Sequence, residues 1–145
     1  MNMIRKYGME PILKPHVDMY DGNWRGYIGN AYSQDSQWKE WFDSYSSFIT
    51  YYAKLARDNQ ATYFNLGTEL DATETREPEW RAVIAEVRSI LPETKLWYGC
   101  NWYPNVGAVN FWDALDFIAV SAYYPLSNHI NPTISELNDA WEPIK

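Results

Sequence analysis

The fold of this 145-residue chain is decided by one stretch of its sequence, Thr62-Tyr63-Phe64-Asn65-Leu66-Gly67-Thr68-Glu69-Leu70. Residues 62–67 are mostly apolar and lack strict polar–apolar alternation, which is typical of a parallel strand buried on both faces. The polar pair Thr68 and Glu69 follows directly. The stretch therefore predicts a strand of a parallel sheet with a carboxylate at its carboxyl end.

The segments around this strand repeat one order of strand and helix. A helix is expected from Gln37 to Asp58, because its apolar residues recur every three or four positions. A second helix is expected to begin near Pro78, since proline suits the first helical turn. The other expected elements are strands over 11–18, 95–100 and 117–122, helices over 109–115 and 134–141, and a helix end at 4–7 before Gly8.

This alternation predicts an α/β fold with a parallel sheet and right-handed crossovers. Two architectures satisfy it, a small doubly wound sheet and part of a (β/α)8 barrel. The GxGxxG and GxxxxGK[ST] signatures of doubly wound nucleotide-binding proteins are absent from the sequence, which favours the barrel. We therefore expect residues 1–145 to form one domain, a partial TIM barrel of about four strands, that is, a half-barrel.

The composition argues against several classes of function. The formal net charge is −7, so we expect no nucleic-acid partner, because nucleic-acid affinity rests on clustered Lys and Arg. No run of 18 apolar residues occurs, so we expect no membrane association through a spanning helix. The first residues do not resemble a secretory signal, which leaves a cytoplasmic location and secretion from a longer precursor both open. Aromatic residues make up 17% of the chain and suit stacking on ring-shaped ligands such as sugars.

Polar or aromatic residues follow each of the four expected strands. The carboxyl ends of parallel strands form the site in α/β folds, so four such ends in succession predict a functional site there. The long loop over residues 19–36 adds an aromatic residue, which we expect to be exposed and suited to stacking on a sugar ring. The candidate residues are, in chain order, His16, Asp18, Trp24, Glu69, Asn101, Trp102 and Tyr123.

Several of these candidates also have a purely structural interpretation. Glu69 is equally consistent with a solvated loop carboxylate or a helix cap, and His16 with a hydrogen-bonded residue at a strand end. The aromatic residues after the third and fourth strands are consistent with packing at the rim. His16 and Asp18 have no evident third ligand nearby, so we expect no metal site and no cofactor. Cys100, the only cysteine, is expected to be a small buried apolar residue.

Several groups of residues occur in one order along the chain: Leu13-Lys14-Pro15-His16-Val17-Asp18, Trp24-Arg25-Gly26, Gly67-Thr68-Glu69-Leu70, Tyr98-Gly99-Cys100-Asn101-Trp102, Phe111-Trp112-Asp113, Leu115-Asp116-Phe117-Ile118 and Ala122-Tyr123-Tyr124-Pro125-Leu126. As a set they resemble glycoside hydrolase family 113, the β-mannanase-type TIM-barrel enzymes. The matching segments resemble the third to sixth strands of that barrel.

The resemblance implies retaining hydrolysis of a β-1,4-linked polysaccharide, mannan or a related β-glucan. By the same resemblance, Glu69 is the general acid/base, which protonates the leaving glycosidic oxygen and then deprotonates the attacking water. The sugar subsite that flanks the cleaved bond is then lined by His16, Asn101, Trp102 and Tyr123, and Trp24 belongs to a neighbouring subsite.

The sequence departs from the family at the nucleophile, a second glutamate on the seventh strand of the barrel. Nothing after Tyr124 resembles that strand, although a retaining mechanism needs two carboxylates about 5–5.5 Å apart. Three hypotheses follow. Two copies of the chain pair as a homodimer that closes an eight-stranded barrel, or Asp18, Asp71 or Glu74 is the second carboxylate, or the chain is a fragment of a longer gene product. The alternative function is that of a carbohydrate-binding protein without full catalysis.

Overall fold

The sheet of the computed structural model has four parallel strands that neighbour one another in chain order, β1-β2-β3-β4. The structure describes residues 1–102 and 105–145. The prediction of a half-barrel built from parallel (β/α) units is therefore confirmed. The strands are β1 (Ile12–Leu13), β2 (Tyr63–Thr68), β3 (Lys95–Asn101) and β4 (Phe117–Ser121).

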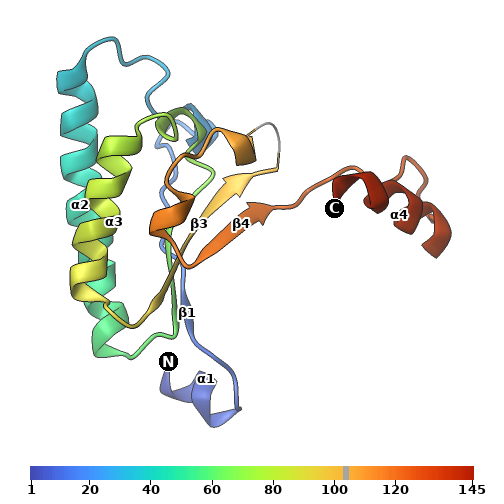
Figure 1. The fold of residues 1–145 in the computed structure, drawn as a ribbon, viewed down its shortest axis with the longest axis horizontal. Helices are drawn as coiled ribbons and strands as arrows, with labels where there is room; N and C mark the ends of the chain where they lie inside the picture. The colour runs from blue at the N-terminus through green and yellow to red at the C-terminus, as the bar shows by residue number, and fades with distance from the viewer. Residues whose placement is uncertain (103–104) are drawn as a thin grey trace.

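Two long helices cover one face of this sheet, and the other face is uncovered (Figure 1). Beyond β4 the chain runs away from the sheet and carries the last helix with it (Figure 1). No helix within the described ranges is long and apolar enough to cross a membrane. The helices are α1 (Asn2–Lys6), α2 (Asp35–Asp58), α3 (Glu77–Ile90) and α4 (Ile134–Trp141), and short 3-10 turns are η1 (Arg25–Tyr27), η2 (Asp71–Thr73), η3 (Asn105–Gly107), η4 (Trp112–Ala114) and η5 (Glu142–Ile144).

Two expected elements differ in the structure. The strand predicted over 11–18 pairs with β2 only at Ile12 and Leu13, because Pro15 has no N–H with which to continue a ladder. The helix predicted over 109–115 is wrong, since η4 alone forms within that range. There the Phe111 side chain is fully buried, with its ring stacked 5.4 Å from that of Trp80, and this tertiary contact takes precedence over helical periodicity.

The core between the sheet and the helices is an aromatic cluster around Trp80, which is fully buried. The Trp80 ring lies edge-on to Tyr45 at 5.5 Å and to Tyr98 at 5.1 Å. Gly67 of β2 lies beneath the cluster, where a Cβ atom would come within 2.8 Å of the Tyr98 ring. Cys100 is fully buried as expected, and burial raises the pKa of its thiol to about 11. This packing fixes β2 and β3 against α2 and α3.

The predicted apolar stripe of α2 is only partly buried. Phe42 is in the core, whereas Trp38 and Trp41 of the same stripe are half-buried and pack against it. The Arg76 guanidinium lies 5.3 Å from the Trp38 ring centroid, in a cation–π arrangement. The outer part of the stripe therefore meets polar groups and solvent.

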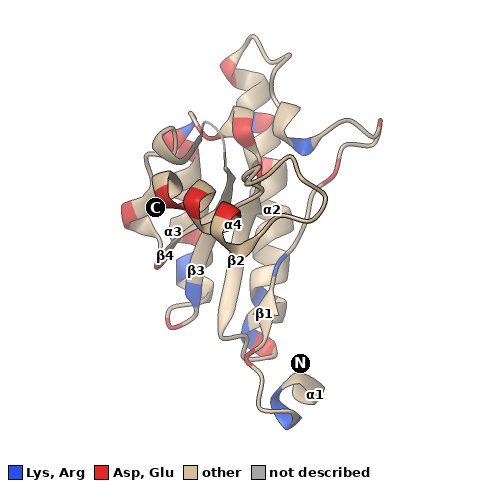
Figure 2. Cartoon of the chain, turned by 90° about the vertical axis from the view of Figure 1, so that its right-hand side faces the viewer, with Lys and Arg blue, Asp and Glu red and all other residues tan. Residues whose placement is uncertain are grey.

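The uncovered face of the sheet carries an apolar hollow of about 250 Å³. Figure 2 looks onto this face, with α2 and α3 behind the sheet. The Nζ atom of Lys14 lies 5.5 Å from the Trp97 ring centroid, so a cation borders the hollow. The hollow is lined by Ile12, Tyr63, Trp97, Phe117 and Ala119.

Asp116, just before β4, ties together α3, β3 and β4. Its carboxylate accepts hydrogen bonds from Arg88 of α3 at 2.6 Å, from the Leu96 N–H at 2.9 Å and from Lys95 at 3.1 Å. Partial burial raises the pKa of Asp116, but these donors outweigh it and hold the pKa at about 2. Because the folded-state pKa lies below the usual value, this stabilisation is present above about pH 4 and is lost as the pH falls through 2.

We expect Asp116→Asn to lower the free energy of unfolding at pH 7 by about 1 kcal/mol, since water screens part of the cluster. Urea denaturation followed by circular dichroism measures the loss, and the difference from wild type should shrink between pH 4 and pH 2. Asp113→Asn is the matched control, because Asp113 pairs with Arg81 at the exposed surface. Equal losses in the two variants would contradict the central role of Asp116.

Candidate active site

Glu69 follows β2 in a backbone conformation that few residues other than glycine adopt, with φ of +52°. Its N–H donates to the Gly99 carbonyl of β3 at 2.8 Å, and the pairing of β2 with β3 is irregular between Asn65 and Thr68. The next N–H, that of Leu70, donates to the Tyr98 hydroxyl at 3.0 Å. These two hydrogen bonds hold Glu69 at the carboxyl end of the sheet.

Tyr98 supports this turn from inside the core. Its hydroxyl donates to the Glu74 carboxylate at 2.9 Å while it accepts from Leu70. Burial, with the nearby charge of Glu74, raises the pKa of Tyr98 well above its usual value, so the phenol remains protonated. Glu74 is itself only 1% exposed. The hypothesis that Glu74 is the second carboxylate is therefore wrong, because a sugar cannot reach a side chain at this depth.

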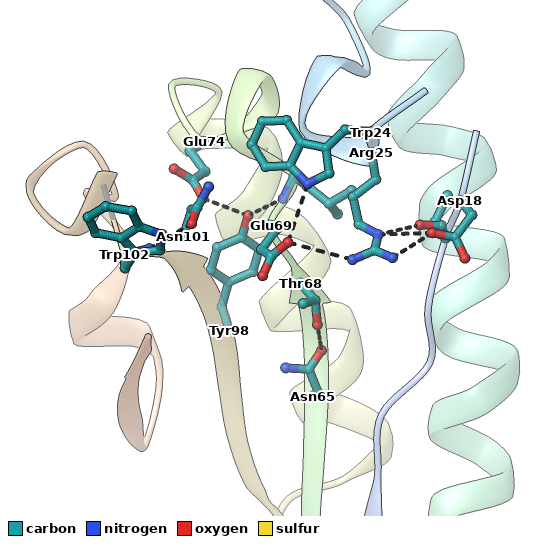
Figure 3. A network of polar contacts seen from close by, with 12 residues as sticks. Asp18, Trp24, Arg25, Asn65, Thr68, Glu69, Glu74, Tyr98, Asn101 and Trp102 are labelled. Atoms are coloured by element: carbon teal, nitrogen blue, oxygen red, sulfur yellow. Dashed lines mark hydrogen bonds and ion pairs between the residues drawn. The ribbon is translucent and has the colours of Figure 1, made fainter. Parts of the chain in front are cut away.

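The Glu69 carboxylate faces two donors from the loop over residues 19–36, as Figure 3 shows. The indole N–H of Trp24 donates to Glu69 Oε2 at 3.3 Å, and Arg25 Nη1 lies 3.7 Å from the same oxygen. The Glu69 side chain is 15% exposed, so its carboxylate is mostly shielded from water but remains reachable. The loop is thereby joined to the end of β2.

Arg25 also binds Asp18, on the side away from Glu69. Its Nη2 and Nε atoms lie 2.5 and 3.1 Å from Asp18 Oδ1, and Nε donates to the Val17 carbonyl at 3.0 Å. Hydrogen bonding and the charge of Arg25 lower the pKa of Asp18. Asp18 and Glu69, which the sequence predicts to belong to one site, are therefore connected through Arg25, to which sequence reasoning assigned no role.

The Trp24 ring is half-buried, so the expectation of an exposed ring is wrong. It lies edge-on to Tyr27 at 5.3 Å and packs on the backbone of Gly26, where a Cβ atom would come within 2.4 Å of it. This packing follows from the tight η1 turn, which folds the ring back over its own loop. The indole is directed at Glu69 rather than presented flat to solvent.

His16 lies close enough to this group to be affected by its charges. Burial lowers the pKa of His16 below 6.5, and the charges of Arg25 and Lys14 lower it further, whereas Asp18 and Glu69 act in the opposite direction. The imidazole is therefore mostly neutral at pH 7, a form with one N–H donor and one acceptor nitrogen. Among the described residues, no group of three or more His, Cys, Asp or Glu side chains could hold a metal ion.

The remaining predicted residues lie at the ends of β3 and β4. Asn101 Oδ1 accepts from the Trp102 N–H at 2.8 Å, and both residues lie at the same end of the sheet as Glu69 (Figure 3). The Trp102 ring lies edge-on to Tyr124 at 5.3 Å. Tyr123 is 78% exposed. The structure thus places Asn101 and Trp102 at the same end of the sheet as Glu69 and leaves Tyr123 exposed after the edge strand β4.

Sequence reasoning assigned no role to Arg25 or Tyr98, and it named Glu74 only as a candidate second carboxylate. A signal existed for Tyr98, since a tyrosine within a buried apolar strand needs a hydrogen-bond partner for its hydroxyl. No spacing rule relates Arg25 to a glutamate 44 positions later, or predicts that Arg25 also reaches Asp18. Only the folded loop brings these three charges together.

Comparisons with known proteins agree on one family. A sequence profile for Glycoside Hydrolase Family 113 matches residues 1–144. A solved GH113 β-1,4-mannanase superposes with a TM-score of 0.81 at 35% identity, over 99% of this chain and 45% of its own. The GH113 β-mannanase AaManA from Alicyclobacillus acidocaldarius, in complex with ManMIm, gives 0.79 at 33% identity, over 99% and 46%. No curated protein matches the chain. The chain spans less than half the length of these solved structures.

The left-handed conformation of Glu69 has a measurable cost. We expect Glu69→Gly to be about 1 kcal/mol more stable than Glu69→Ala, because glycine has no Cβ to clash at positive φ. Chemical denaturation of the two variants measures the difference. Gln60, at φ of +51° and outside the site, provides a matched pair, Gln60→Gly and Gln60→Ala. An alanine variant as stable as glycine at position 69 would contradict the strained geometry.

Proposed function

The chain belongs to glycoside hydrolase family 113, and from this we propose that it takes part in hydrolysing a β-1,4-linked polysaccharide, mannan or a related β-glucan, with Glu69 as general acid/base. The observation that carries the proposal is the position of Glu69. Its side chain is 15% exposed at the carboxyl end of a parallel sheet, where (β/α) barrels place their catalytic groups.

In this mechanism Glu69 acts twice. It first gives its proton to the leaving glycosidic oxygen, and it then takes a proton from the water that releases the sugar. The neutral His16 and the amide of Asn101 supply hydrogen bonds to sugar hydroxyls, with Asp18 at the same rim. Trp102 and Tyr123 supply apolar faces for a sugar ring, and Trp24 borders the neighbouring subsite.

The second carboxylate is proposed to come from outside the four strands. Glu74 is buried, as is Oδ1 of Asp71, and Asp18 is already bound to Arg25. This observation also favours the second candidate function, carbohydrate binding without hydrolysis. The two candidates differ in whether bonds are cleaved, since both predict sugar binding at the same rim.

We expect the purified chain to release reducing sugar from mannan or glucomannan and to release less from cellulose and xylan. Glu69→Gln should abolish release while it preserves binding of β-mannooligosaccharides in calorimetry, because the amide keeps the shape but cannot transfer a proton. Glu93→Gln is the control, since Glu93 is exposed between α3 and β3 at the opposite end of the sheet. Binding without release in wild type would favour the carbohydrate-binding function, and neither binding nor release would contradict both.

A second copy of the chain is our proposed source of the other four strands of a closed barrel. The sheet has two unpaired parallel edges, at β1 and β4, and an apolar hollow on the uncovered face. Phe117, within that hollow, is 46% exposed. Two copies provide eight strands, the number that closes a (β/α) barrel, and each copy spans 45% of a solved family member.

We expect light scattering at micromolar concentration to give twice the mass of one chain. Phe117→Glu should return the protein to the mass of a monomer, because it places a charge in the apolar hollow. Tyr20→Glu is the control, since Tyr20 is fully exposed in the loop before η1. A monomer in wild type at all concentrations tested would contradict closure by a second copy.

A further inference from the structure

We propose that Arg25 is a positioning residue for Glu69, and that Asp18 anchors Arg25 so that the guanidinium stays in place whichever charge Glu69 carries. The inference rests on the proposed role of Glu69 as acid/base. Figure 3 shows Arg25 between the two carboxylates.

The contacts of Arg25 are unequal in length. Three are short and lie on the Asp18 side: 2.5 and 3.1 Å to Asp18 Oδ1, and 3.0 Å to the Val17 carbonyl. The contact to Glu69 Oε2 is an ion pair at 3.7 Å. The Arg25 side chain is 20% exposed, so solvent screens these charges only partly. Asp18 and the Val17 carbonyl therefore fix the guanidinium through Nε and Nη2. The remaining nitrogen, Nη1, faces Glu69.

This arrangement suits a carboxyl group that must change charge twice in each catalytic cycle. When Glu69 is ionised, the cation at 3.7 Å stabilises it. When Glu69 is protonated, that attraction weakens, but Arg25 keeps its three contacts with Asp18 and Val17 and has no reason to move. Asp18 also offsets the charge of Arg25.

Trp24 helps to orient the Glu69 carboxylate. Its indole N–H and Arg25 Nη1 both meet Oε2 of Glu69. The proton that Glu69 transfers therefore belongs on the other oxygen, Oε1. Because Trp24 and Arg25 are neighbours in the chain, one turn of backbone places both donors on one oxygen.

The effect of these charges on the pKa of His16 can be measured without a bound sugar. The charges that act on His16 are those of Arg25, Lys14, Asp18 and Glu69, and the Glu74 carboxylate accepts the hydrogen bond of Tyr98. His16 is a natural reporter, because Arg25 lowers its pKa while Asp18 and Glu69 raise it. The only other histidine, His129, pairs with Glu136 of α4 and serves as an internal reference.

The test is 13C NMR at pH 7 of the whole chain labelled at its glutamate carboxyl groups, together with a titration of the His16 imidazole. In Arg25→Gln we expect the Glu69 carboxyl resonance to move from its wild-type position, because the carboxylate loses the cation beside Oε2. In Asp18→Asn it should move as well, since Arg25 then loses the carboxylate that anchors it. The pKa of His16 should rise in Arg25→Gln and fall in Asp18→Asn.

Arg57→Gln is the matched control, because Arg57 pairs with its neighbour Asp58 at the far end of α2. If the Glu69 resonance in Arg25→Gln or in Asp18→Asn stays where it lies in Arg57→Gln, the proposal is overturned. Should Arg25→Gln fail to fold, the Asp18→Asn spectrum still decides. Sugar release is measured separately, so a chain with the expected spectra but no cleavage keeps the positioning role and loses the proposed function.

Discussion

Two backbone hydrogen bonds, from the N–H groups of Glu69 and Leu70, are the constraint on which the candidate site depends. The N–H groups of Glu69 and Leu70 donate to the Gly99 carbonyl and the Tyr98 hydroxyl, so both tie the end of β2 to β3. The left-handed conformation of Glu69 costs stability, and the buried aromatic packing of Tyr98 against Trp80 offsets that cost. The core of the fold thus determines where the carboxylate points.

The polar part of the site is organised around one arginine shared by two carboxylates. Arg25 belongs to a short turn that also directs Trp24, and the Trp24 ring can lie over Gly26 only because that residue has no Cβ. Ahead of α2, the loop over residues 19–36 contains only the short η1 turn, so its contacts with Asp18 and Glu69 hold it in place. The loop and the strand end act as one unit, which suits a carboxyl group that must keep its place while its charge changes.

The uncovered face of the sheet bears on two questions at once, how the barrel is closed and where a second carboxylate stands. The sheet presents unpaired edges at β1 and β4 and an apolar hollow between them. A retaining mechanism needs a second carboxylate beside Glu69 on the same side. In a closed barrel, opposite strands contribute to one rim, so whatever covers the hollow would also stand across from Glu69.

The sequence alone determined the class of fold, because buried parallel strands and amphipathic helices have periodicities that depend on local geometry. It also placed Glu69, Asn101 and Trp102 at strand ends, since strand ends follow from strand positions. It failed for the segment over 109–115, where the burial of Phe111 beside Trp80 outweighed helical spacing. Only the tertiary structure decided that Trp24 turns inward and that Arg25 bridges Asp18 and Glu69, because those contacts join residues whose separation along the chain carries no periodic signal.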